Sequence, residues 1–92
     1  MRLNQRDLLG GDAAERYHIA SMVVQCRPEK LASTVIAIAS IEHVEVPEQD
    51  ACGKLVALIQ TQGESNLMSC IREIETAAGV ISASLAYHQI DE

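Results

Sequence analysis

The stretch from Tyr17 to Glu29 constrains the fold more than any other part of this chain. Its residues up to Gln25 are mostly apolar and include β-branched Val and Ile, which is typical of a strand. Arg27 and Pro28 end that run, and a proline fits the first turn of a helix because the missing N–H has no intrahelical partner there. The stretch therefore predicts a strand that leads directly into a helix.

The same order of elements recurs further along the chain. Apolar residues after Pro28 repeat at helical spacing, and a strand over 41–46 follows until Pro47 stops it. A third strand over 54–61, a second helix opened by Gly63 and capped by Gly79, and a fourth strand over 80–88 complete the pattern. Right-handed crossovers interleave two such βαβ units into one antiparallel sheet, ordered 4-1-3-2, with both helices on one face. The predicted class is α+β, a ferredoxin-like βαββαβ sandwich.

A chain of 92 residues suits one small domain. Residues 1–16 carry scattered charges without sustained periodicity, so we expect a mobile N-terminal arm ahead of a domain over 17–89, with 90–92 as a tail. The sequence holds neither a signal-peptide core nor a transmembrane run. Three widely spaced cysteines indicate a reducing compartment. We therefore expect a cytoplasmic protein with no membrane insertion.

The charge and the histidines argue against several functions. A net charge of −6 disfavours nucleic acid and favours a cationic partner. His18 and His88 are expected to lie close together, but no acidic or cysteine partner stands at ligand spacing, so no metal is predicted. Arg27 lacks the glycine-rich loop of a phosphate-binding enzyme. No catalytic group is visible in the sequence.

Strand alternation assigns the two faces of the sheet. In the third strand Leu55, Ala57 and Ile59 are expected to face the helices. In the fourth strand we expect Ile81, Leu85 and Tyr87 inside, and Ser82, Ser84, Ala86 and His88 outside. The first strand is ambiguous, with Ala20, Met22 and Val24 favoured inside.

The sheet face without helices should therefore carry a small apolar patch formed by Val23, Val56, Leu58 and Ala86. Such a patch on a small domain marks a protein contact. One interpretation is a sheet-to-sheet homodimer, since symmetric pairs are the commonest oligomers. The alternatives of a monomer and a weak homodimer both stay open.

Three segments resemble the NapD family of assembly chaperones for periplasmic nitrate reductase. They are His18–Glu29, Gly53–Val56 and Gly79–Gln89, and the closing Tyr87-His88-Gln89 is the most specific part. The similarity covers about residues 17–89. The chain departs from the family pattern by its longer arm, Met1–Arg16, and by His43, where a glycine is more typical.

The resemblance implies a non-catalytic chaperone without a cofactor. It would bind the twin-arginine signal peptide of the catalytic nitrate reductase subunit and restrain export until cofactor insertion is complete. An amphipathic helix of that peptide would rest on the open face, and its arginines would meet rim carboxylates. The alternative is a small ligand-binding or dimerising regulatory domain of the same fold. The expected peptide-binding residues are Ser21, Val23, Val56, Leu58, Ser82, Ser84 and Ala86, with Glu45, Glu48 and Asp50 as the arginine contacts.

Overall fold

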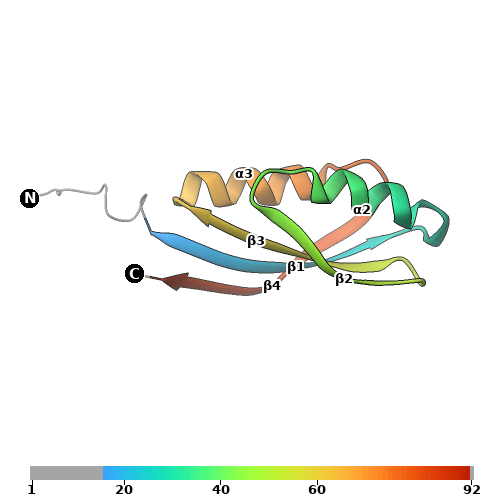
Figure 1. Cartoon of the computed structure of the whole chain (residues 1–92), viewed down its shortest axis with the longest axis horizontal. Coiled ribbons are helices and arrows are strands. Elements are labelled where there is room, and N and C mark those ends of the chain that lie inside the picture. The colour runs from blue at the N-terminus through green and yellow to red at the C-terminus, as the bar shows by residue number, and fades with distance from the viewer. Residues whose placement is uncertain (1–15, 92) are drawn as a thin grey trace, which may run out of the picture.

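The computed structural model describes residues 16–91 and contains one sheet and two helices. Figure 1 shows the helices lying along one side of the sheet. The elements in chain order are β1 (Tyr17–Cys26), the 3-10 turn η1 (Pro28–Lys30), α2 (Leu31–Ala39), β2 (Val44–Asp50), β3 (Lys54–Gln62), α3 (Glu64–Glu75) and β4 (Val80–Asp91).

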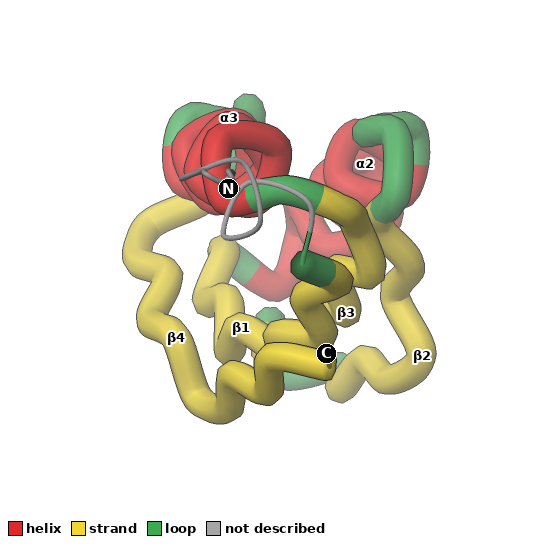
Figure 2. Tube along the Cα trace, turned by 90° about the vertical axis from the view of Figure 1, so that its left-hand side faces the viewer, coloured by secondary structure: helices red, strands yellow, loops and turns green. Residues whose placement is uncertain are grey.

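The sheet has the order β2-β3-β1-β4, and every neighbouring pair of strands is antiparallel. Viewed along the strands, α2 and α3 lie side by side over one face, and no helix formed by residues 16–91 covers the opposite face (Figure 2). This is the predicted order read from the other edge, so the expected α+β sandwich is confirmed.

The core fills the space between the helices and the inner face of β1 and β3. Buried residues alternate along both strands, and the buried residues of one strand lie opposite those of the other, as antiparallel pairing requires. The inward assignment that was ambiguous for β1 is thereby settled as expected. The paired inner residues are Ala20 and Ile59, Met22 and Ala57, and Val24 and Leu55, all fully or almost fully buried.

Pro28 begins the short turn η1, which continues into α2 as the sequence predicts. The expected cap at Gly79 is wrong, because α3 already ends at Glu75 and its C-cap is Thr76, whose backbone N–H donates to the carbonyl of Arg72. Gly79 has φ +93, and a Cβ there would lie 2.3 Å from Oγ1 of the buried Thr34. Gly79 therefore lets the backbone pass close to α2 just before β4 begins.

The second strand differs from its predicted extent. It begins at Val44 and continues past Pro47 to Asp50, with a register irregularity between Glu45 and Glu48. Pro47 lies within that irregularity on an edge strand, so its missing N–H removes no bond from the ladder. A proline stops a central strand but not an edge strand, and the predicted stop is wrong for that reason.

The predicted faces of β4 are wrong over part of the strand, because two register shifts reset the alternation. Tyr87 pairs with Ser21 on the open side, and Leu85 pairs with Met22 on the helix side, which leaves Ala86 as an extra residue between them. Ile81 is likewise extra and is 64% exposed. Tyr87 therefore faces outward, and His88 lies on the same side as the buried His18.

The predicted arm, residues 1–16, lies outside the described residues except for Arg16, whose carbonyl accepts a hydrogen bond from the N–H of Gly63 at 2.8 Å. At the other end, β4 runs to Asp91, two residues beyond the boundary expected at Gln89.

Candidate functional site

The open face is built on the two central strands. Val23 pairs with Val56, and Ser21 pairs with Leu58, so these four side chains form a contiguous group on the side away from the helices. All four are half-buried although neither α2 nor α3 covers them. Val23, Val56 and Leu58 of the predicted patch therefore lie together on the face where the sequence places them.

The strand β4 adds small residues to one flank of this group. Ser84 pairs with Val23, and Ser82 pairs with Gln25, so both serines lie on the open side. Ala86 is the extra residue of the register shift and has no direct partner on β1. Of the three β4 residues expected in the site, the two serines join the patch directly and Ala86 does not.

The three predicted carboxylates line the other flank. Glu45 pairs with Leu58, Glu48 with Val56, and Asp50 with Lys54, which puts all three on the open side of β2. They are exposed, as edge positions on an uncovered face should be. An acidic edge thus runs beside the apolar centre, and Lys54 is the cation next to it.

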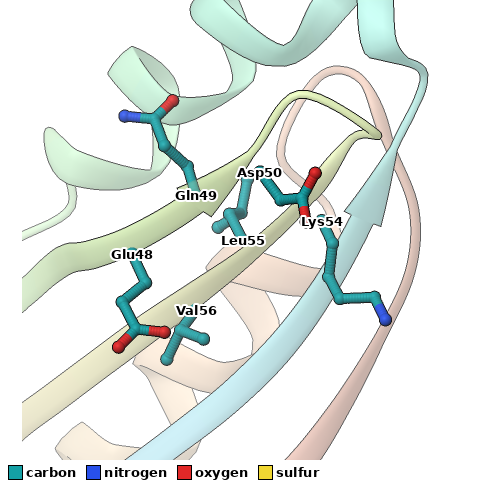
Figure 3. Close-up of a pocket in the computed structure, with 6 residues that line it drawn as sticks. All are labelled: Glu48, Gln49, Asp50, Lys54, Leu55 and Val56. Atoms are coloured by element: carbon teal, nitrogen blue, oxygen red, sulfur yellow. The ribbon is translucent and has the colours of Figure 1, made fainter.

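A shallow pocket of about 200 Å³ lies where this edge meets β3 (Figure 3). The side chains of Glu48 and Val56 lie close together at one end, and Lys54 extends away at the other. Gln49, Asp50 and Leu55 complete its lining. The pocket therefore offers an apolar wall and a carboxylate to the same ligand.

Asp50 differs from the two glutamates in being engaged within its own turn. Its Oδ1 accepts a hydrogen bond from the backbone N–H of Cys52 at 2.8 Å. This bond, supported by the nearby Lys54, lowers the pKa of the Asp50 carboxyl. The carboxylate raises the pKa of the exposed Cys52 thiol in turn. One oxygen of the Asp50 carboxylate is therefore already used within the turn, which makes Glu45 and Glu48 the more available partners for a cationic ligand.

The open face also includes Tyr87, an aromatic residue that the sequence predicts on the helix side. Tyr87 is 53% exposed beside Ser21, and its hydroxyl donates to Oε1 of Gln89. Ile19, opposite Gln60, extends the apolar surface along β1. Strict alternation missed Tyr87 because the extra residue at Ala86 is not visible in the sequence.

The two histidines meet as expected. Nδ1 of His18 lies 3.0 Å from Nε2 of His88, and the rings stack with centroids 5.2 Å apart. Nε2 of His18 is buried without a hydrogen-bond partner. Within residues 16–91 no group of three or more His, Cys, Asp or Glu residues is arranged to hold a metal ion. The pair links β1 to β4.

Arg27 forms an ion pair with Glu29 at 3.9 Å, and both side chains are mostly exposed. It faces a carboxylate rather than a phosphate-binding loop.

Comparison with known proteins decides the family. The family model described as "NapD protein" matches residues 17–92. The chain belongs to the NapD family. It is 33% identical over 91 residues to the chaperone NapD of Haemophilus influenzae, covering 98% of this chain and 97% of the relative. The chaperone NapD of Escherichia coli is 27% identical over 77 residues, with 83% and 88% covered.

A solved structure supports the same placement. The solution structure of the E. coli Tat proofreading chaperone protein NapD matches with a TM-score of 0.74 and 27% identity, covering 83% of this chain and 81% of that one. A chaperone role, which is not an enzymatic one, follows from these relatives and agrees with the resemblance drawn from the sequence. It also disfavours the regulatory-domain alternative. No helix within residues 16–91 is long and apolar enough to cross a bilayer.

Proposed function

We propose that this NapD family member binds the twin-arginine signal peptide of the catalytic subunit of periplasmic nitrate reductase. By holding the peptide it restrains export until cofactor insertion and maturation are complete. The binding surface is the open sheet face with the acidic edge of β2. The observation that carries this proposal is the adjacency of an uncovered apolar centre and a row of carboxylates on one face.

The apolar part of the peptide rests on the central strands. Val23, Val56 and Leu58 present branched side chains, and the neighbouring Ser21 and Ser84 are small enough to let a helix approach closely. An amphipathic helix laid on such a surface removes apolar area from water on both partners. Tyr87 borders this surface and adds an amphipathic ring with a hydroxyl.

The arginines of the peptide meet the β2 edge. Glu48 lies directly across from Val56. When an apolar residue of the peptide contacts Val56, a neighbouring arginine of the peptide can therefore reach the Glu48 carboxylate. Guanidinium groups bind carboxylates in paired hydrogen bonds. Because these carboxylates are exposed, their attraction acts mainly on the association rate and weakens with salt.

Calorimetric titration of the full chain with a synthetic signal peptide tests this proposal. Leu58→Glu places a charge in the centre of the open face and should weaken binding at least about tenfold, since a buried unpaired carboxylate opposes docking. The control is Met68→Glu, at an exposed apolar residue of α3 on the far side of the sheet. It should leave the affinity unchanged. Equal affinities for wild type and Leu58→Glu would place the site elsewhere.

A further inference from the structure

The free edge of β4 has the properties of a pairing surface. In the sheet formed by residues 17–91, β4 is the outermost strand and has β1 as its one neighbour. The backbone N–H and C=O groups on its outer side therefore face away from the sheet. Such a row is a template for another strand unless the sequence protects it.

Most of the usual protection is missing from this strand. The 12-residue strand carries neither a proline nor a charged residue from Val80 to Ile90. Four of the seven large apolar side chains that are exposed among the described residues lie on it. Those four are Ile81, Leu85, Tyr87 and Ile90, between 43% and 64% exposed.

The exposed side chains lie on both faces of the sheet. Leu85 pairs with the buried Met22, so it belongs to the helix-side layer, and Tyr87 pairs with Ser21 on the open side. Leu85 is 50% exposed because no strand lies beyond it. An added strand would cover part of each layer as well as complete the ladder.

We infer that β4 pairs with β4 of a second copy of this chain, in an antiparallel twofold arrangement. Charge selects this partner. The whole chain carries a net charge of −6, and pairing through β2 would set Glu45, Glu48 and Asp50 against their own copies. Like charges opposite each other destabilise a strand pair. The stretch from Val80 to Ile90 can face its own copy without that repulsion.

The segment that pairs lies within the regular stretch Ser82–Leu85. The extra residues Ile81 and Ala86 bound it, and the stretch beyond Ala86 ends near the charges of Asp91 and Glu92. In a twofold antiparallel pair, residues directly opposite must point to the same face. With the axis at Ser84, Leu85 of one copy lies opposite Ala83 of the other, a large residue against a small one.

The resulting dimer is weak, because a short ladder buries less than the roughly 1,200 Å² of a stable interface. It leaves the open face uncovered, since it extends the sheet at its edge. The proposal is therefore independent of peptide binding, and each copy keeps its own peptide surface. A sheet-to-sheet dimer through Val56 and Leu58 would instead compete with the peptide.

Sedimentation equilibrium of the full chain, from about 20 µM to about 1 mM, tests the inference. The wild type should change from monomer towards dimer over this range. Leu85→Lys should raise the dimer dissociation constant at least about tenfold, because lysine on an edge strand blocks pairing. Met68→Lys is the matched control, since Met68 is 51% exposed on α3, and it should leave the constant unchanged.

Amide hydrogen exchange of the wild type tests the same contact without a substitution. Exchange within Ser82–Leu85 should slow at least about threefold as the concentration rises over that range, and β2 amides should not respond. A wild type that stays monomeric at the highest concentration contradicts the inference. A dimer that Leu58→Glu dissociates and Leu85→Lys leaves intact also contradicts it. Protection of β4 that appears only when signal peptide is added contradicts it as well.

Discussion

The edge strands β2 and β4 border the same sheet but present opposite chemistry. Within seven residues β2 carries three carboxylates, a proline and a register irregularity. β4 is longer, is uncharged up to Ile90, and holds most of the exposed large apolar side chains of the described residues. The charges and the proline of β2 disfavour strand pairing, and β4 lacks these features up to Ile90. In our proposals the β2 edge takes part in peptide binding and the β4 edge in self-association.

The largest effect is expected at the glycines that precede β3 and β4. A Cβ at Gly53 would lie 2.1 Å from the backbone carbonyl oxygen of Cys26, and at Gly79 it would meet the side-chain oxygen of Thr34. Both glycines have positive φ. The Thr34 side chain can rotate away from an added Cβ, but the Cys26 carbonyl belongs to the backbone and cannot. Gly53→Ala should destabilise by about 3 kcal/mol, and Gly79→Ala by about 1–2 kcal/mol.

Urea unfolding of both glycine variants gives these free energies. A larger loss of stability for Gly53→Ala would show that the turn between β2 and β3 is more constrained than the turn that leads into β4. Equal losses would mean that the entry to β4 is just as rigid.

The next effect concerns the acidic edge. Glu48→Lys should weaken signal-peptide binding about fivefold to tenfold, mainly through a slower association rate, since the reversed charge repels the arginines. The difference from wild type should shrink in high salt. Stopped-flow association measures it, and Glu73→Lys on the exposed side of α3 is the control with the same change of charge. A matching loss in the control would assign the effect to net charge alone.

The smallest effect lies at the start of β2. His43 has φ +73, a conformation that costs a non-glycine residue about 1–2 kcal/mol, and its carbonyl accepts a hydrogen bond from Gln60 that glycine would keep. His43→Gly should therefore stabilise the chain by about 0.5–1 kcal/mol in urea unfolding, after the greater entropy of unfolded glycine is subtracted. Thr76→Gly, at the end of α3 with φ −103, should bring no such gain. A loss of stability at His43 would show that its side chain stabilises the start of β2.

The sequence predicts positions correctly where a single pattern, such as strand alternation, holds along a whole element. Alternation placed Val23, Val56 and Leu58 on the open face because β1 and β3 pair without interruption. The antiparallel relation of strand ends was enough to bring His18 and His88 together.

Prediction failed where a single residue changes the register. The extra residue Ala86 turns Tyr87 outward, and nothing in a run of apolar and small residues marks it. The predicted stop at Pro47 fails because the place of this proline on an edge strand depends on the strand order, which its sequence neighbours do not reveal. Backbone irregularities of this kind come from tertiary packing, so local pattern does not reveal them.

Backbone amide chemical shifts, measured by NMR as the signal peptide is added to the full chain, show whether the peptide binds to the open face of the sheet. If the peptide binds to the open face, the largest changes are expected at Ser21, Val23 and Leu58, further changes at Glu45 and Glu48, and small ones along α2 and α3. Changes concentrated on the helices, with the open face and the β2 edge unaffected, would contradict binding to the open face.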